Sequence, residues 1–236
     1  MIEQDKALGK GGFCWDAAFC LGEYVIAQLL QQQQQQQAKS ASLLQVVELG
    51  SGTGLAGMMV AKAVPGLQVH LTDLPVIMPL LTRNVRRNFV GHILPNSHKD
   101  DSSALADEPA GLFVGDNHAT ATNSSSSPVI AQVLDWSDVV TNPQHYQNNN
   151  YDVILGADVV ASLYDPVALA QTMYTLAHGN TVVYLSFKER LSVMHRQFEA
   201  AIAERFEEWH IISSGSGSRN RNPEVQIMYM RRPKNK

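Results

Sequence analysis

Residues 46–57 read VVELGSGTGLAG, an apolar strand that runs into a glycine-rich turn and then into a helix. Glycine has no Cβ, so a turn built from it can bend sharply and bring its backbone within contact distance of a ligand. The helix that follows points its free N–H groups at the same place. The stretch therefore predicts a ligand-binding turn at the end of a parallel strand.

A second signal comes at the end of the next expected strand. The run from His70 to Asp73 ends about 20 residues beyond the glycines. A carboxylate at this distance can accept hydrogen bonds from both hydroxyls of a ribose. The two signals together predict a cofactor that contains a nucleoside.

Two cofactors are compatible with the turn. Gly52 to Gly57 satisfies the dinucleotide pattern G-x-G-x-x-G, which favours NAD(P). The longer stretch from Glu48 to Gly54 has an acid inside the strand and three alternating glycines, and it resembles motif I of the class I S-adenosylmethionine (SAM) methyltransferases. The chain shows no persuasive Tyr/Lys or His/Asp set for hydride transfer, so we expect SAM.

Composition favours one domain over residues 1–236. The chain has 236 residues, of which 44% are apolar, enough for one well-covered α/β core. Its net charge of −4 argues against general nucleic-acid binding. There is no apolar run near 18 residues and no signal peptide at the start. We expect a soluble monomer in the cytoplasm, with the nucleus as a second location, that binds neither nucleic acid nor membrane.

Apolar runs alternate with helical patterns along the chain. We expect strands at 43–49, 68–72, 130–134, 151–156 and 181–187, and helices at 55–64, 76–89 and 166–178. A helical stretch at 191–206 precedes two extended runs, 209–213 and 225–231, which we expect to pair as a hairpin. This order predicts an α/β fold: a Rossmann-like, doubly wound, seven-stranded sheet with a C-terminal antiparallel hairpin.

Three polar stretches are predicted to be low-complexity insertions, near residues 31–40, 95–128 and 142–150. The first is a glutamine run that we expect to follow the first helix. The eight histidines show no ligand spacing, so we expect no metal. Cys14 and Cys20 are expected to be reduced thiols.

Six motifs in register carry a family resemblance. They are Trp15 to Ala18, Glu48 to Gly54, Thr72 to Pro75, Leu134 to Trp136, Gly156 to Val160 and Ser186 to Arg190. In this order they resemble methyltransferase family 16, the small seven-strand protein-lysine methyltransferases related to the chaperone and elongation-factor enzymes. The resemblance implies a SAM-dependent enzyme that methylates a lysine of a protein substrate, such as a chaperone or a translation factor.

The resemblance also implies the cofactor site. Its residues are Trp15, Glu48, Gly50, Ser51, Gly52, Gly54, Asp73, Asp135, Trp136 and Ala157. The glycines would cradle the methionine end, Asp73 would hold the ribose, Asp135 and Trp136 would flank the adenine, and Trp15 would close the methionine side. There are competing interpretations. Trp15 and Trp136 can be ordinary core aromatics, and Asp73 can be only a helix cap.

The acceptor side departs from the family. Asp158 is the expected catalytic residue, a carboxylate that positions the lysine amine, with a helix cap as its alternative role. The family pattern places a tyrosine three residues later, where this chain has Ala161; Tyr164 comes three residues further on. Only about 14 residues precede Trp15, fewer than the family usually has. A non-lysine acceptor and a catalytically weak SAM-binding protein that acts by association therefore stay open as alternatives.

Overall fold

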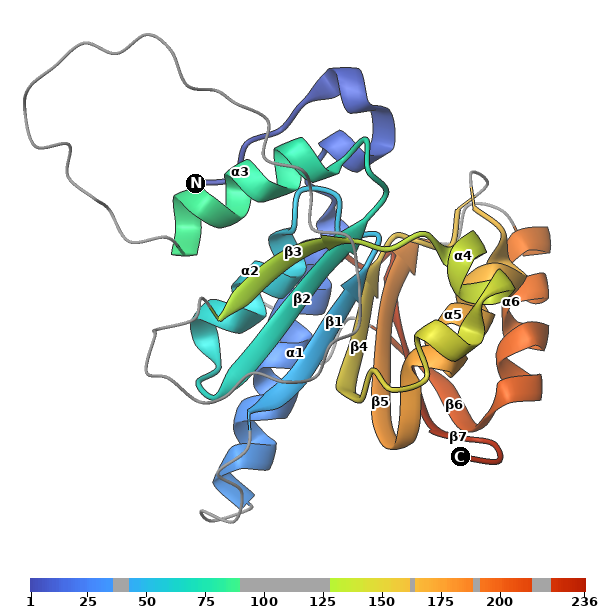
Figure 1. Cartoon of the computed structure of the whole chain (residues 1–236). Helices are drawn as coiled ribbons and strands as arrows, with labels where there is room; N and C mark the ends of the chain where they lie inside the picture. The colour runs from blue at the N-terminus through green and yellow to red at the C-terminus, as the bar shows by residue number, and fades with distance from the viewer. Residues whose placement is uncertain (36–42, 90–127, 162–163, 189–191, 214–221) are drawn as a thin grey trace, which may run out of the picture.

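The computed structural model describes residues 1–35, 43–89, 128–161, 164–188, 192–213 and 222–236. Seven strands form one sheet in the order β3-β2-β1-β4-β5-β7-β6 (Figure 1). The pairs among β1 to β5 are parallel, whereas β7 is antiparallel to both β5 and β6. The strands are β1 (Leu44–Leu49), β2 (Leu67–Asp73), β3 (Val129–Val133), β4 (Tyr151–Ala157), β5 (Ala177–Lys188), β6 (Phe206–Ser213) and β7 (Val225–Pro233). The predicted doubly wound sheet with its antiparallel hairpin is confirmed.

Helices cover both faces of the sheet. One face packs against α1 (Asp16–Gln35), α2 (Leu55–Ala63) and α3 (Met78–Phe89), and the other against α4 (Trp136–Thr141), α5 (Pro166–Leu176) and α6 (Ser192–Arg205). Two short 3₁₀ helices are η1 (Lys6–Gly12) and η2 (Pro143–His145). The connections after β1 and β4 therefore lead to opposite faces, which opens a crevice at the carboxyl ends of these adjacent strands.

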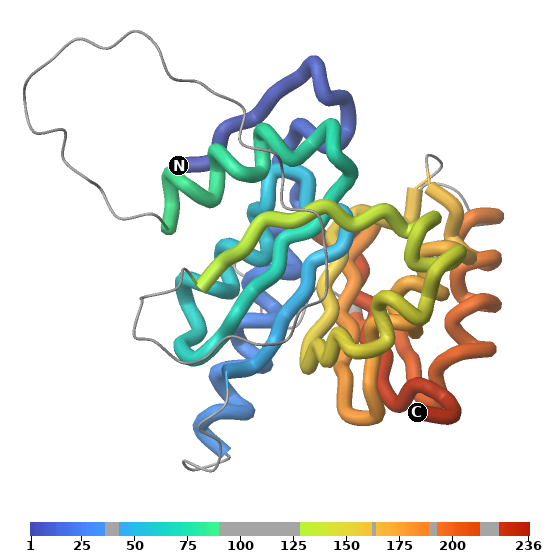
Figure 2. The backbone as a smooth tube through the Cα atoms, in the orientation of Figure 1, coloured from blue at the N-terminus to red at the C-terminus, as the bar shows by residue number. Residues whose placement is uncertain are grey.

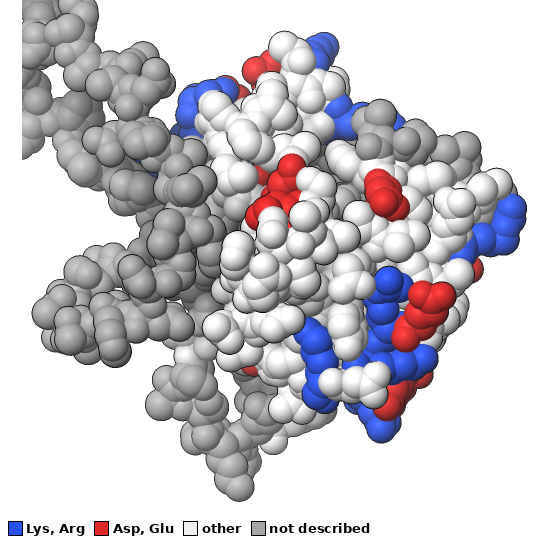
Figure 3. Space-filling model, turned by 45° about the vertical axis from the view of Figure 1, so that its right-hand side comes forward, with Lys and Arg blue, Asp and Glu red and all other residues white. Residues whose placement is uncertain are grey.

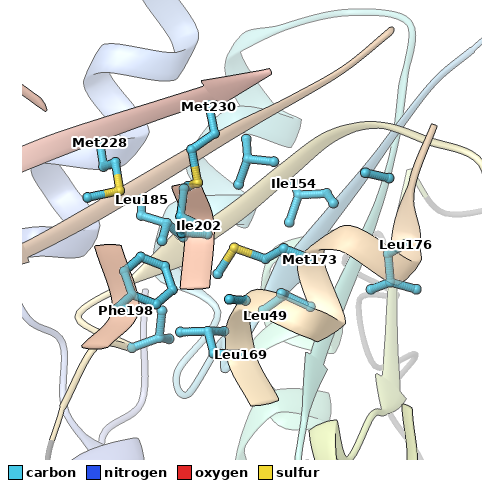
Figure 4. Close-up of a cluster of buried hydrophobic side chains, with 14 of the residues drawn as sticks. Leu49, Ile154, Leu169, Met173, Leu176, Leu185, Phe198, Ile202, Met228 and Met230 are labelled. Carbon is cyan, nitrogen blue, oxygen red and sulfur yellow. The ribbon is translucent and has the colours of Figure 1, made fainter. Parts of the chain in front are cut away.

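Each face has its own core, because successive strand side chains alternate in direction. Val46 packs toward α1 and α2, whereas Val47 and Leu49 pack toward α5. Figure 4 shows the second core, where side chains from α5 and α6 meet those of β5 and β7. Because both faces of the central strands β1 and β4 are covered, the packing on both sides holds the ends of these strands in place.

One described helical stretch, residues 6–35, is long and apolar enough to cross a membrane by length and composition alone. Its apolar side chains Leu21, Val25 and Leu29 are at most 2% exposed. They pack in the core that α1 shares with α2 and the sheet. One side of α1 is thus part of the core.

Charges of both signs are interspersed at the surface. On the face shown in Figure 3, Lys and Arg lie beside Asp and Glu. Arg231 pairs with Glu208, and Arg232 with Glu207 at 3.0 Å, which links β7 to β6. Such pairs balance the basic residues locally.

Several predicted boundaries are wrong in an informative way. The helix expected to reach Phe206 ends at Arg205, and Phe206 instead opens β6 opposite Pro233, with its ring buried. The helix expected to reach His178 ends at Leu176, because β5 begins at Ala177 opposite Tyr151. Burial in the sheet overrides local helical propensity at both places.

The predicted insertions also need correction. Gln31 to Gln35 continue α1 and do not follow it. The segment near 142–150 contains η2 and the buried Tyr146, whose hydroxyl donates to Asp138. Burial, together with this carboxylate, raises the pKa of Tyr146 to about 12, so the phenol keeps its proton. Most of the insertion near 95–128 lies outside the described residues.

Gly57 on α2 tests how closely this helix packs on the sheet. A Cβ at Gly57 would lie 2.4 Å from Leu71 Cδ2 and 2.7 Å from Glu48 Oε2. We expect Gly57→Ala to lower the free energy of unfolding by about 1–3 kcal/mol, because the overpacking exceeds the gain in helix propensity. Chemical denaturation measures the change.

Gly179→Ala is the matched control, because its nearest neighbour would be 3.4 Å away, at ordinary contact distance. Equal stability of the Gly57 and Gly179 variants would contradict the close packing.

Candidate active site

The turn after β1 adopts a conformation that requires glycine. Gly50 and Gly52 have φ angles of 61° and 54°, in the left-handed region that L side chains rarely adopt. A Cβ at Gly50 would lie 2.9 Å from Val159 Cγ1, and one at Gly52 would lie 2.8 Å from the carbonyl oxygen of Gly11. Gly54 follows as the residue that precedes α2. The predicted glycine turn therefore lies in close contact with two other segments of the chain.

A buried carboxyl group, that of Glu48, connects β1 to the helix that follows the turn. Glu48 is 1% exposed, and its Oε2 accepts a hydrogen bond of 2.9 Å from the backbone N–H of Gly57. Burial raises the pKa of Glu48 from 4.5 to about 8, although the bond from Gly57 opposes the shift. At neutral pH the carboxyl of the cofactor-free protein therefore holds a proton for most of the time.

Ser51 joins the ends of β1 and β2. Its N–H donates to the carbonyl of Thr72 at 2.9 Å, and its hydroxyl oxygen accepts from the N–H of Thr72 at 3.0 Å. Asp73 completes the junction, because its Oδ2 accepts from the N–H of Gly52 and its Oδ1 from the N–H of Leu74, both at 2.7 Å. Burial raises the pKa of Asp73, and the two N–H groups oppose the shift. Asp73 thus fixes the turn and also faces the crevice.

Residues 1–14, which we call the N-terminal strap, cross over the glycine turn. Glu3 pairs with Arg83 and Arg87 of α3 at 2.9 and 2.7 Å, and its N–H donates to Asn84 Oδ1. Figure 2 shows the strap and α3 side by side. The strap continues through η1 to Phe13, whose ring lies 6.1 Å from that of Trp15. Residues 1–14 therefore lie against both α3 and the glycine turn.

An open hollow of roughly 840 Å³ lies between the strap and the ends of β1, β2 and β4. Its lining includes most of the predicted cofactor residues: Trp15, Glu48, Gly50, Ser51, Gly52, Asp73 and Ala157. The predicted catalytic residue Asp158 lines the same hollow.

A second hollow of roughly 620 Å³ adjoins the first and is lined by two further predicted residues, Asp135 and Trp136, whereas the predicted Gly54 lines neither hollow. Asp135 also caps α4, because its Oδ1 accepts from the N–H of Ser137 at 2.9 Å. The Trp136 ring lies 5.3 Å from the ring of Tyr164. Trp136 therefore offers an aromatic wall, as an adenine site requires.

Asp158 has an unusual backbone conformation directly after β4. Its φ is 58°, and its N–H donates to the carbonyl of Ser186 on β5 at 2.7 Å. Such strain in a residue other than glycine is typical of functional positions. Asp158 lies at the carboxyl end of β4, where it lines the first hollow.

The arrangement fits SAM. This cofactor carries a sulfonium, an ammonium and one carboxylate, so its net charge is positive. The side chains of Asp73 and Asp158 line the first hollow together with one cation, Lys10, and with the Glu48 carboxyl, which is mostly protonated in the cofactor-free protein. The glycine turn leaves room for the methionine end, and the Trp136 hollow leaves room for the adenine. Among the described residues there is no group of three or more His, Cys, Asp or Glu that could hold a metal ion.

Sequence reasoning missed several lining residues: Lys10, Gly11, Phe13 and Thr53. Three of them belong to the strap, which carries no motif and is held against the turn by its bonds to α3 and by the contact of Cys14 with Thr53. Thr53 lies inside the glycine turn itself, so the motif already pointed to it. Tyr164 was named as a residue that follows the acceptor motif, and it lines both hollows.

The strand order, the glycine turn after β1 and the acid at the end of β2 define a SAM-dependent methyltransferase of the Rossmann-like class. Solved structures share the fold: the carbon methyltransferase DszA has a TM-score of 0.56 at 16% identity and covers 89% of this chain and 53% of its own. Human methyltransferase-like protein 13, solved with S-adenosylhomocysteine (SAH), has a TM-score of 0.52 at 12% identity and covers 93% and 81%.

The family model for lysine methyltransferases matches residues 1–97 and 90–205, and this chain belongs to that family. It is 28% identical to the mouse protein N-lysine methyltransferase METTL21A over 84% of this chain and 73% of the mouse protein. It is 28% identical to EEF1A lysine methyltransferase 3 of Xenopus tropicalis over 97% and 78%. The yeast protein-lysine N-methyltransferase EFM6 is 26% identical over 80% and 68%.

The predicted activity and cofactor are thereby confirmed: the chain is a SAM-dependent protein-lysine methyltransferase. The dinucleotide interpretation of Gly52 to Gly57 is set aside. The roles assigned to individual site residues stay predictions.

The raised pKa of Glu48 predicts a pH dependence of stability. Between pH 4.5 and about 8 the folded protein keeps the proton that the unfolded chain releases, so the free energy of unfolding falls as the pH rises through this window. Glu48→Gln keeps an acceptor for the Gly57 N–H but has no charge. We expect the variant to lack this fall, and near pH 8 to exceed wild type by on the order of a few kcal/mol.

Urea denaturation of both proteins in the absence of cofactor, at steps from pH 5 to pH 8.5, measures the difference. Parallel pH profiles for wild type and variant would show that Glu48 ionises normally.

Proposed function

We propose that Asp158 orients the substrate lysine for methyl transfer. The supporting observation is its position between two hollows. Asp158 and Trp15 line the cofactor hollow and also a smaller one of roughly 420 Å³, which is bounded further by Cys14, Asp16 and Lys188. A lysine side chain that enters the smaller hollow meets the Asp158 carboxylate before it reaches the cofactor.

Charge favours a cationic side chain at this entrance. Lys188 Nζ lies 3.3 Å from Asp16 Oδ2 and 3.3 Å from Glu224 Oε2, so its charge is matched by two carboxylates. Asp158 adds a third carboxylate to the lining. The balance near the entrance is negative, which attracts an ammonium group.

When bound, SAM supplies an electrophilic methyl group on a sulfonium. Attack by the neutral lysine amine forms the C–N bond as the C–S bond breaks, and a thioether leaves. Asp158 accepts a hydrogen bond from the amine and so directs the nitrogen lone pair toward the methyl carbon. The ammonium must first lose a proton, and the half-buried site assists because desolvation disfavours the charged form. That proton passes to solvent, and the methyl transfer leaves the positive charge on the methylated nitrogen.

We propose a translation factor as the substrate, with EEF1A as the first candidate. The relative EEF1A lysine methyltransferase 3 aligns over 97% of this chain. Incubation of purified protein with tritium-labelled SAM and cell lysate tests two claims: that the enzyme methylates a protein, and that this protein is EEF1A. We expect one labelled band at the mass of EEF1A. A single band of another mass would keep protein methylation and replace the substrate, whereas no labelled protein would contradict the proposed transfer.

Asp158 and Asp73 should separate transfer from cofactor binding. Asp158→Asn tolerates the left-handed backbone as Asp does, so we expect a normal fold, SAH affinity within about twofold of wild type, and transfer reduced about 100-fold or more. Asp73→Ala removes two charged hydrogen bonds from the turn, so we expect SAH affinity to fall by about 10- to 100-fold.

Calorimetric titration with SAH and transfer at saturating SAM give the two readouts, and near-ultraviolet circular dichroism confirms the fold. Loss of SAH binding in folded Asp158→Asn would assign Asp158 to the cofactor.

A further inference from the structure

Tyr164 lies on the wall between the two large hollows. Three residues line both of them, namely Gly50, Asp73 and Tyr164, and Tyr164 alone of these brings an aromatic ring. Gly50 belongs to the glycine turn and Asp73 to the end of β2. Tyr164 reaches the same place from the opposite side of the crevice, from the connection between β4 and α5.

The ring is held from several directions. The N–H of Tyr164 donates to the carbonyl of Ala161 at 3.0 Å, and the next residue, Asp165, caps α5 by accepting from the N–H of Val167 at 2.8 Å. The ring itself packs against Trp136 with the planes tilted by 56°. Tyr164 is therefore a placed side chain at the crevice, fixed by backbone and ring contacts.

The hydroxyl of Tyr164 lies in the field of two site carboxylates. Burial raises the pKa of Tyr164, and the charges of Asp73 and Asp158 raise it further. The phenol therefore keeps its proton, and its oxygen stays available to accept a hydrogen bond. One of these carboxylates belongs to the cofactor side and the other to the proposed acceptor side.

Ala161 lines the first hollow together with Tyr164 and Asp158. Its methyl group leaves space in this wall that a large side chain would fill. The aromatic ring in this wall therefore comes from Tyr164, three residues after Ala161.

We propose that Tyr164 is an acceptor-site residue that positions the lysine amine together with Asp158; this rests on the function proposed above. A neutral amine has two N–H groups and one lone pair. Asp158 accepts from one N–H and the Tyr164 hydroxyl accepts from the other, which leaves the lone pair facing the methyl carbon. The ring lines the cofactor hollow, where the amine end of the lysine arrives, and keeps water away from the nitrogen.

The experiment compares wild type with Tyr164→Phe, which keeps the ring, and Tyr164→Leu, which removes it. Tyr174→Phe is the control, because the hydroxyl of Tyr174 donates to Lys234 far from the crevice. The acceptor is the protein that wild type labels in lysate, EEF1A in our proposal, in purified form. SAH affinity, kcat, KM for the acceptor, and the ratio of mono-, di- and trimethyllysine by mass spectrometry are measured for each.

For Tyr164→Phe we expect SAH affinity within about twofold of wild type and kcat reduced about tenfold, the effect of one lost hydrogen bond. The product ratio should shift toward higher methylation, because the lost hydroxyl no longer holds an N–H and leaves room for a methyl group. Tyr164→Leu should also raise KM for the acceptor. A residue that only supported the fold would not change the product ratio.

Two results would overturn the assignment. If the Tyr164 variants lost SAH affinity more than about tenfold and transferred normally at saturating SAM, Tyr164 would belong to the adenine side. If wild type methylated the acceptor and both variants matched it in kcat, KM and products, Tyr164 would have no role in transfer. A wild-type protein that bound SAH but methylated no protein would overturn this inference and the proposed function together.

Discussion

The hydrogen bond between the buried carboxyl of Glu48 and the N–H of Gly57 fixes the angle between β1 and α2. Because α2 lies so close to the sheet, the chain has to turn within the residues between them, and it does so with left-handed glycines. This tight glycine turn leaves the cofactor hollow open. Hydrogen bonds of Ser51 and Asp73 connect the turn to β2. One buried polar contact thus determines where a cofactor can lie.

Sequence predicted the parts of the site that local chemistry determines. A glycine-rich turn between an apolar strand and a helix is typical of nucleoside-cofactor sites, so β1, α2 and the cofactor class follow from residues 46–57. Asp73, Asp135 and Asp158 were located because each ends a recognisable strand, and parallel strands bring their carboxyl ends to one edge. The strand order itself needed the alternation of apolar and helical patterns along the whole chain.

The rest depends on contacts between segments that are distant in sequence. The N-terminal strap reaches the glycine turn through Glu3 and Arg83, which lie 80 positions apart, and no local pattern reports that pairing. Tyr164 follows an alanine where the family has tyrosine, and only the packing on Trp136 shows which way its ring points. The ends of α5 and α6 were misplaced for the same reason, since pairing with β4 and β7 decides where those helices stop.

The position of β7 between β5 and β6 has a consequence for how the protein is made. On the ribosome β6 emerges before β7, yet β7 is the strand with which β6 pairs. Until β7 is synthesised, the edge of β5 is unpaired. Phe206, the first residue of β6, has no partner strand either. Exposed strand edges of this kind invite pairing with other chains. The nascent enzyme therefore passes through a stage in which the edge of β5 is open to such pairing, and β7 ends that stage by pairing with both β5 and β6.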